Sequence, residues 1–396
     1  MNKVFLKPSR EKSLLKGHPW IYSGAIARIE GAIENGDTVK VYSSANEFLA
    51  LAAFSRESQL ALRVWSRDEN AVINTDFFSS KLRIAEMLRQ TALIPQSASA
   101  WRLCASEADG LPGVTIDVYN NFAVMQLSSA GADFHRTEII QALQQLRSWD
   151  GIYERSDVPV RKYENLPMRT GTVAGMEPPE LLEIHEHGRN FYVDIAHGHK
   201  SGFYCDQRDS RSAVQQMSAG KNVLNLFCYT GGFGIAAALG GASHVLNVDC
   251  SAPALNMAQK NFKLNNIAPE RYENIEADAF SFLRKCRGEK RQFELIVLDP
   301  PKLVDSMKNM HKGCRAYKDA MLQAMHILKP GGLLFTFSCS GLVTGELFAK
   351  IAAEAASDSR CDARIIAQLG QGSDHPVACC FPESRYLKGL LIMRCN

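Results

Sequence analysis

The sequence predicts a multidomain protein with a small all-β barrel or sandwich, a central α+β domain and a C-terminal α/β domain. Three observations support this fold class. Short strand-like runs separated by turns fill the first 75 residues, helices and strands mix in the next 110, and strands alternate strictly with helices after residue 186. We therefore predict domains at 1–75, 76–185 and 186–396, which suits a chain of 396 residues.

The composition is that of an ordinary globular protein, with 46% hydrophobic and 22% charged residues. No apolar run is long enough for a signal peptide or a membrane span, so we expect a cytoplasmic protein without a membrane partner. Eleven cysteines without a Cys-x-x-Cys spacing do not support a zinc ribbon or a redox dithiol. We expect reduced thiols and no metal.

Charge is unevenly distributed, although the net charge of +3 is too small to indicate a polyanionic partner. Residues 1–28 hold one acid, Glu11, and six basic side chains: Lys3, Lys7, Arg10, Lys12, Lys16 and Arg28. Either a solvated loop or a nucleic-acid contact surface accounts for such a cluster.

The first domain is predicted from β-rich runs and turn residues. Strands are expected over Thr38–Tyr42, Phe48–Phe54 and Leu60–Trp65, and a short helix over Glu11–Lys16. Asn35-Gly36-Asp37 is a strong turn signal before the first of these strands.

The central domain combines both periodicities. Apolar residues at helical spacing predict a helix over Phe77–Ala92 and a second one over about Asp133–Leu146. The predicted strands are Gly113–Val118, Phe122–Leu127 and Gly151–Glu154. The Pro/Gly-rich stretch Gly171–Pro179 is expected to be an exit linker.

The C-terminal domain is predicted to begin with a hairpin from about Leu181, which turns at Glu186-His187-Gly188. Parallel strands separated by helices follow at Val223–Phe227, His244–Asp249, Tyr272–Glu276, Leu295–Leu298 and Leu333–Ser338. Ala363–Leu369 and Tyr386–Arg394 are expected to pair as an antiparallel hairpin at one sheet edge. That ending distinguishes the domain from a plain dinucleotide fold.

A nucleotide-type cofactor site is predicted at the end of the first of these parallel strands. The strand runs into Tyr229-Thr230-Gly231-Gly232 and then an alanine-rich helix, so glycines and a helix N-terminus meet there. The next strand ends at Asp249, whose carboxylate can accept ribose hydroxyls. The spacing is not Gly-x-Gly-x-x-Gly, which disfavours a nicotinamide cofactor.

Two further acids lie at predicted strand ends. Asp278, with Ala279 after it, is either a contact to the adenine or a helix cap. Asp299-Pro300-Pro301-Lys302 holds an acid where open α/β sheets bind ligands, and it resembles a motif of base-modifying methyltransferases. Lys302 stands where enzymes that methylate exocyclic amines have an aromatic residue, which counts against that reaction.

Cys339 follows the fifth parallel strand, between Ser338 and Ser340. Most cytosolic cysteines are small buried hydrophobic residues. At this position, however, a thiolate can add to C6 of a pyrimidine and make C5 nucleophilic enough to accept a methyl group. Asp299 is the candidate to bind N3 or the exocyclic amine as charge develops.

Together these residues resemble the bacterial 23S ribosomal RNA large subunit methyltransferase I family over nearly the whole chain. The most specific stretches are 10–15 with His18-Pro-Trp20, 107–113, 197–208, 229–232, 299–302, 338–341, 374–376 and 386–388. The resemblance implies an N-terminal PUA domain, which is a small RNA-binding barrel, and a Rossmann-like class I methyltransferase domain. It also implies S-adenosylmethionine as cofactor and 5-methylcytosine formation at cytosine 1962 of 23S rRNA.

Site residues follow from the motifs and the resemblance. The catalytic candidates are Cys339, Asp299 and Lys302. The cofactor-binding candidates are Tyr229, Thr230, Gly231, Gly232, Asp249, Asp278, Ala279, Asp299 and Pro300, with Gln207 and Arg208 at the methionine end. Arg208 is nearly as well suited to an interdomain salt bridge. The RNA-binding candidates are Lys7, Arg10, Lys12, Lys16, His18 and Lys388.

Several alternatives stay open. An RNA methyltransferase acting on another position or on an exocyclic amine is the first, and a non-catalytic RNA-binding protein is the second. Lys302 either orients the flipped nucleotide or binds a phosphate, and the base that removes the C5 proton is unassigned. His375, Tyr386 and Lys388 either line the pocket or pack at a sheet edge. A homodimer is compatible with the sequence, which does not decide the oligomeric state.

Overall fold

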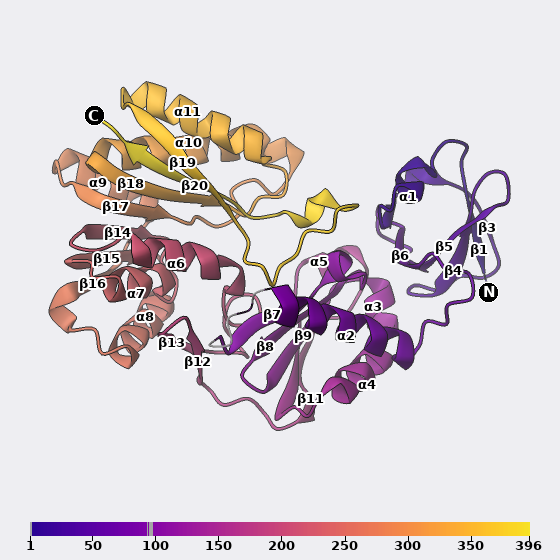
Figure 1. Cartoon of the computed structure of the whole chain (residues 1–396). Coiled ribbons are helices and arrows are strands. Elements are labelled where there is room, and N and C mark those ends of the chain that lie inside the picture. The colour runs from indigo at the N-terminus through magenta and orange to yellow at the C-terminus, as the bar shows by residue number, and fades with distance from the viewer. Residues whose placement is uncertain (1, 93, 95–97) are drawn as a thin grey trace. The chain divides into compact units, whose positions relative to one another are not determined.

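The computed structural model describes residues 2–92, 94 and 98–396 (Figure 1). They form two compact units, which we name unit 1 and unit 2. Unit 1 comprises Met1–Ile184, Val193–Cys205 and Ser373–Ser384, and unit 2 comprises His185–Tyr192, Asp206–Gly372 and Arg385–Asn396. The chain therefore leaves and re-enters unit 2 more than once.

The N-terminal part of unit 1 is a six-stranded sheet in the order β2-β6-β5-β4-β1-β3. Its strands are β1 Lys3–Leu6, β2 Trp20–Ile21, β3 Ile26–Glu30, β4 Thr38–Tyr42, β5 Phe48–Phe54 and β6 Leu62–Ser66. Val39 and Val41 alternate with half-buried neighbours and pack into a core with Val4 and Leu62. The predicted all-β domain is confirmed, and the predicted Glu11–Lys16 helix is the single turn α1, Lys12–Leu15.

The central part of unit 1 is a five-stranded sheet in the order β11-β10-β9-β8-β7. Its strands are β7 Ala100–Ala105, β8 Val114–Tyr119, β9 Phe122–Leu127, β10 Gly151–Ser156 and β11 Arg169–Gly175, and its helices are α2 Thr75–Ala92, α3 Ala130–Phe134, α4 Arg136–Leu146 and α5 Val160–Tyr163. Helices α2 and α4 pack on each other, and their apolar residues share one core with the sheet. The α+β prediction is confirmed.

Two local predictions for this domain are wrong. Gly171–Gly175 is not linker but the end of β11, which pairs antiparallel with β10. A Cβ on Gly175 would lie 2.3 Å from the Asp150 carbonyl oxygen, so this glycine permits close backbone approach rather than flexibility. The helix expected over Asp133–Leu146 is interrupted at His135, which separates α3 from α4.

A buried ion pair joins the two parts of unit 1. Arg63 Nη2 of β6 lies 2.8 Å from Glu164 Oε1, which follows α5. Ser55 Oγ donates to the same carboxylate over 2.6 Å, and the Ala130 N–H does so over 3.2 Å. Burial raises the pKa of Glu164, but Arg63 and these donors hold it below its ordinary value.

The predicted hairpin is confirmed as β12, Leu182–Glu186, and β13, Arg189–Val193. His187 and Gly188 join the strands with φ of 50° and 76°. Two consecutive residues with positive φ are typical of a tight hairpin turn that matches strand twist. This turn brings Glu186 and Arg189 next to each other at 3.1 Å.

Unit 2 contains a seven-stranded sheet in the order β16-β15-β14-β17-β18-β20-β19. Its strands are β14 Asn222–Leu226, β15 His244–Asp249, β16 Tyr272–Glu276, β17 Phe293–Leu298, β18 Leu328–Ser338, β19 Ala363–Gly370 and β20 Lys388–Arg394. The first five strands are parallel, and β20 runs antiparallel to both β18 and β19. The predicted α/β sheet with a terminal antiparallel hairpin is confirmed.

Helices cover both faces of this sheet (Figure 1). They are α6 Arg208–Gln216, α7 Gly232–Leu239, α8 Ala252–Leu264, α9 Ala279–Gly288, α10 Met310–Ile327 and α11 Gly345–Ser359. The strands contribute near-continuous apolar residues, as expected of a sheet buried on both faces. Because the five parallel strands end at one edge, the polar residues that follow them gather there.

No helix in the described residues is long and apolar enough to cross a membrane. Nor do three or more His, Cys, Asp or Glu side chains of those residues come together as a metal site would require.

Candidate functional site

The glycine turn after β14 has a constrained backbone. Phe227, Tyr229 and Gly231 have φ of 57°, 48° and 83°. A Cβ on Gly231 would lie 3.1 Å from Ala258 Cβ, so a side chain there would meet α8. Helix α7 begins directly after this turn. Its first N–H groups and the positive end of its dipole can bind an anionic group. Positive φ at two non-glycine residues is the kind of strain found at ligand sites.

Asp249 ends β15 beside this turn. Its Oδ2 accepts the Tyr229 N–H over 2.8 Å, and its Oδ1 accepts the Ser251 N–H over 3.0 Å. The carboxylate is half-buried and held by backbone donors from the glycine turn and from the cap of α8. The structure thus brings Asp249 against the backbone of the glycine turn at Tyr229.

Asp278 caps α9, because its Oδ1 accepts the Ser281 N–H over 2.8 Å. The residue is exposed and Ala279 behind it is buried. The helix-cap alternative is therefore observed. Contact of Asp278 and Ala279 with a cofactor stays a prediction, which a cap does not preclude because the carboxylate has a second oxygen.

Asp299 follows β17 and accepts a hydrogen bond from Gln207 Nε2 to its Oδ2 over 3.0 Å. Gln207 is 2% exposed, and its Oε1 has no hydrogen-bond partner among the described residues. A buried amide oxygen without a donor is costly, and it is available to accept a hydrogen bond from a ligand. An α-ammonium group, as at the methionine end of S-adenosylmethionine, is a donor of the right chemistry. Tyr386 supports this segment, because its hydroxyl donates to Asp206 Oδ2 over 2.6 Å.

Arg208 belongs to a buried charge cluster around Glu186. Glu186 Oε2 lies 2.5 Å from Arg211 Nη2 and 3.7 Å from Arg208 Nε, and Oε1 lies 3.1 Å from Arg189 Nη2. Burial raises the pKa of Glu186, but the three guanidinium groups hold it below its ordinary value. The cluster joins the hairpin to α6, and Arg211 also lies next to the glycine turn, since a Cβ on Gly232 would be 3.3 Å from Arg211 Cδ.

Cys339 follows β18 and is half-buried. The serines on both sides of it are tied to Tyr317 of α10. Ser338 Oγ donates to the Tyr317 hydroxyl over 3.0 Å, and that hydroxyl is 3.1 Å from Ser340 Oγ. Ser340 Oγ also accepts the Val304 N–H over 3.1 Å. Because Leu298 and Thr336 are paired in register, Cys339 and Asp299 leave the sheet at the same edge.

The remaining candidates differ in exposure. Lys302 is exposed, whereas Lys388 is buried and donates to the Ser340 and Tyr386 carbonyl oxygens. His375 is buried in unit 1 with its Nδ1 3.0 Å from Asp374 Oδ1. Asp374 in turn accepts the Arg102 N–H over 2.8 Å. His375 thus packs within unit 1.

Sequence reasoning missed Tyr317 and Glu186. Tyr317 lies at an apolar position of a helix, so its pattern resembles that of any core aromatic residue. Glu186 was assigned only to a turn, although an acid close to Arg189, Arg208 and Arg211 was a visible signal for an ion cluster.

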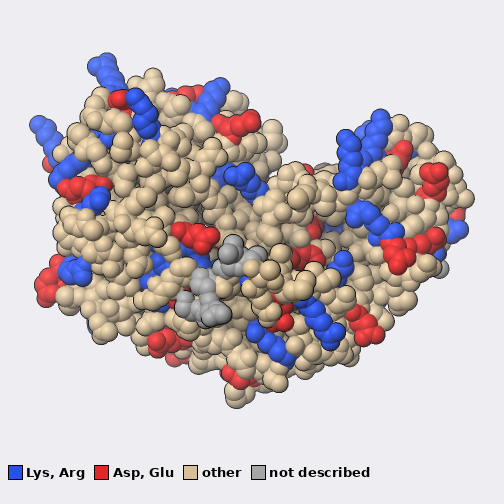
Figure 2. All heavy atoms as spheres, in the orientation of Figure 1, with Lys and Arg blue, Asp and Glu red and all other residues tan. Residues whose placement is uncertain are grey.

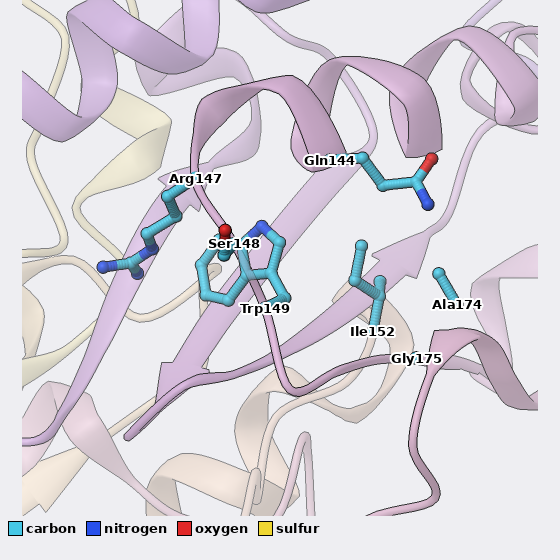
Figure 3. Close-up of a pocket in the computed structure, with 7 residues that line it drawn as sticks. All are labelled: Gln144, Arg147, Ser148, Trp149, Ile152, Ala174 and Gly175. Atoms are coloured by element: carbon cyan, nitrogen blue, oxygen red, sulfur yellow. The ribbon is translucent and has the colours of Figure 1, made fainter.

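The pocket drawn in Figure 3 contains none of the predicted catalytic or cofactor residues. It has a volume of about 270 Å³ and is lined by Gln144, Arg147, Ser148, Trp149, Ile152, Ala174 and Gly175. Arg147 stacks on Trp149 with its guanidinium 4.0 Å from the ring, and Trp149 Nε1 donates to the Leu143 carbonyl. We assign no function to this pocket.

Comparison with known families agrees with the geometry. A family model for S-adenosylmethionine-dependent methyltransferases matches residues 134–365, and one for PUA-like domains matches residues 4–67. Ribosomal RNA large subunit methyltransferase I of Aeromonas salmonicida is 48% identical over 98% of this chain and 98% of its own. The protein of that name from Photobacterium profundum is also 48% identical, with the same coverage.

The chain belongs to the ribosomal RNA large subunit methyltransferase I family. A solved structure of a putative S-adenosylmethionine-dependent methyltransferase from Streptococcus mutans covers 99% of this chain and 100% of its own, with a TM-score of 0.86 and 25% identity. Another, a putative methyltransferase complexed with SAH, superposes equally well. Like its family, this methyltransferase uses S-adenosylmethionine, and the N-terminal sheet is a PUA-like domain.

Replacing Asp249 with asparagine should weaken S-adenosylmethionine binding by about 10- to 100-fold, because a hydrogen bond to a charged group contributes roughly 1.5–3 kcal/mol. Isothermal titration calorimetry of the full chain measures the dissociation constant. Glu273→Gln on the neighbouring strand β16 is the matched control. Glu273 is exposed and lies near the start of its strand, whereas Asp249 is at the carboxyl end of β15. Unchanged binding by the asparagine variant would contradict a cofactor role for Asp249.

Proposed function

We propose that this methyltransferase transfers a methyl group to C5 of one cytosine in 23S rRNA through a covalent Cys339–C6 adduct. The relatives at 48% identity are named for large-subunit ribosomal RNA, which supports an rRNA substrate. The observation that carries the C5 assignment is Cys339, on a turn held by Tyr317 at the strand end next to that of Asp299.

The proposed reaction uses groups in this arrangement. The Cys339 thiolate adds to C6 of the cytosine, and the ring electrons move so that C5 becomes nucleophilic. S-adenosylmethionine supplies an electrophilic methyl group, which C5 attacks. A base then removes the C5 proton, the C5–C6 double bond re-forms, and the thiolate leaves. As the adduct forms, N3 takes up a proton, which it gives back when the thiolate leaves; Asp299, held by Gln207, would carry that proton or accept a hydrogen bond from the exocyclic amine.

We also propose that Gln207 and the glycine turn bind the cofactor. Gln207 Oε1 would accept from the ammonium group of the methionine end, and Asp249 from the ribose hydroxyls. Tyr229–Gly232, Asp278, Ala279 and Pro300 complete the proposed cofactor site. Arg208 is the weaker candidate, because its guanidinium already lies beside Glu186.

Bisulfite sequencing of rRNA tests the proposed reaction. RNA from cells with the gene deleted should lose one protected cytosine in 23S rRNA, and the wild-type gene should restore it. In parallel, RNA containing 5-fluorocytosine at that position should form a denaturation-resistant adduct with the purified protein. Loss of methylation at an exocyclic amine, without loss of a bisulfite-protected cytosine, would instead support the alternative reaction.

We further propose domains at 1–75, 76–185 and 186–396. The first of these domains would bind RNA. Lys7, Arg10, Lys12 and Lys16 are all exposed, and Figure 2 shows Lys and Arg side chains over the part of the surface where Figure 1 draws α1. Arg10 also lines a pocket of about 260 Å³ with Trp20 and Tyr22. Extracting a base from structured RNA costs a few kcal/mol, which phosphate contacts by such a domain would offset.

Replacing Lys12 and Lys16 together with glutamate should weaken affinity for an rRNA fragment by about tenfold or more, because each lost phosphate contact removes counterion release. The slope of log affinity against log salt should fall by roughly 1–2, while S-adenosylmethionine binding should not change. Point variants are preferable to deleting residues 1–75, because the deletion would remove Arg63 and leave the buried Glu164 without its ion-pair partner. Lys285→Glu on α9 with Lys290→Glu just after this helix, both at exposed positions, is a control of equal charge change. An equal effect of both double variants would argue against a specific role of α1.

A further inference from the structure

Lys388 occupies an unusual position for a lysine. It is the first residue of β20, it is paired with Ser338 in the antiparallel register, and it is 7% exposed. Its Nζ donates to the Ser340 and Tyr386 carbonyl oxygens, each over 2.7 Å. The ammonium group is therefore anchored on the turn that carries Cys339.

The charge of Lys388 is poorly compensated. Burial lowers the pKa of Lys388 to about 8; the Cys339 sulfur, when ionised, raises this pKa, and the charges of Arg385 and Lys302 lower it. Within the described residues, the hydrogen-bond acceptors of this ammonium are two carbonyl oxygens, and no carboxylate forms an ion pair with it. A buried ammonium usually needs an anion, because neutral carbonyl groups satisfy its donors but not its charge. Cys339 is the acid that acts on it.

We infer that Lys388 is a positioning residue that keeps Cys339 as a thiolate. An anion on Sγ would compensate the buried ammonium, and the ammonium would in turn stabilise the anion, since the attraction is mutual. The thiol proton passes to water and Lys388 keeps its own, so no other reactant is needed. The inference deepens the proposed function, because a thiolate is the form that would add to C6.

The two hydrogen bonds of Lys388 also explain why its charge can act on the Cys339 sulfur in particular. The carbonyl of Ser340 fixes Nζ one residue beyond Cys339, and Tyr317 fixes the serines on both sides. The second carbonyl belongs to Tyr386, whose hydroxyl binds Asp206 next to Gln207. Lys388 thus connects the Cys339 turn to the segment that holds Asp299.

The test is the pH dependence of Cys339 alkylation by iodoacetamide, followed by peptide mass spectrometry in the full-length protein. In the wild type, the rate should rise with a midpoint below about 8.5, the value of an ordinary thiol. Lys388→Met should slow alkylation at pH 7 by about tenfold or more, which equals a shift of one pH unit or more in the midpoint. Lys388→Arg should keep the charge and much of the rate. The half-buried Cys361, before β19, should react equally in all three proteins.

A wild-type Cys339 that titrates like an ordinary thiol would overturn the inference, even if the methionine variant failed to fold. So would an unchanged profile in a folded Lys388→Met protein, with folding checked by thermal unfolding and S-adenosylmethionine binding. The 5-fluorocytosine adduct separates this result from the proposed function. A Lys388-dependent thiolate without any RNA adduct would support the inference and contradict the covalent mechanism.

Discussion

Replacing Cys339 with alanine should reduce methylation of the rRNA substrate by at least about 10³-fold, corresponding to roughly 4 kcal/mol of transition-state stabilisation. The reason is that C5 of cytosine does not attack a methyl group at a useful rate unless a nucleophile has added to C6. Single-turnover transfer of labelled methyl from S-adenosylmethionine to an rRNA fragment measures the effect. The 5-fluorocytosine adduct should disappear in the same variant.

The matched control is Cys361→Ala, which removes another half-buried thiol from unit 2. Its sulfur contacts the Met325 and Ser359 carbonyl oxygens, so it has a local packing role. The control should methylate at close to the wild-type rate. Cofactor affinity should be unchanged in both variants. Methylation at the wild-type rate by Cys339→Ala would rule out the covalent mechanism and favour a different acceptor atom.

Replacing Glu186 with glutamine should lower the free energy of unfolding by about 3–5 kcal/mol, because breaking a buried ion cluster leaves uncompensated charges. Three guanidinium groups, from Arg189, Arg208 and Arg211, would then share one neutral amide. Since Arg211 lies next to Gly232, we also expect weaker cofactor binding. Urea denaturation monitored by circular dichroism measures the loss. Glu183→Gln on the exposed side of the same strand β12 should change stability by less than about 0.5 kcal/mol.

The sign of the pH dependence follows from the lowered pKa of Glu186. The group is ionised more readily in the folded than in the unfolded protein, so its contribution is complete above the unfolded value of about 4.3. It is lost as the pH falls through the folded pKa. Wild-type stability should therefore drop in acid more steeply than that of Glu186→Gln. Equal pH profiles, or an equally stable variant at pH 7, would show that the cluster does not stabilise the fold.

The sequence predicted the order and type of elements well where the signal is local. Thr38–Tyr42, Phe48–Phe54 and His244–Asp249 match the structure residue for residue, because alternation and turn residues act within a few positions. The error at Gly171–Gly175 arose because the conformation of this segment is set by a non-local contact. The glycines there are a local signal for a linker, but the segment pairs with the neighbouring strand β10 and forms the edge of the sheet.

Convergence of the candidate site was also predictable in outline. Tyr229, Asp299 and Cys339 follow parallel strands and Asp249 ends one, and parallel strands end at one edge whatever their order. What could not be predicted was how each side chain is held. Gln207 is 92 residues from Asp299, so the bond between them has no local sequence signal.

By itself, the sequence determined the succession of all-β, α+β and α/β regions, the glycine turn and the acids and thiol at the strand ends, because periodicity and chain order encode them. The tertiary structure alone decided that Lys388, expected at an RNA surface, is buried behind the Cys339 turn, and that Glu186 is the centre of three arginines. The physical reason is the long sequence separation between the residues that interact. Burial and charge pairing depend on neighbours brought together by the sheet, 48 residues away for Ser340 and Lys388, and no local pattern records them.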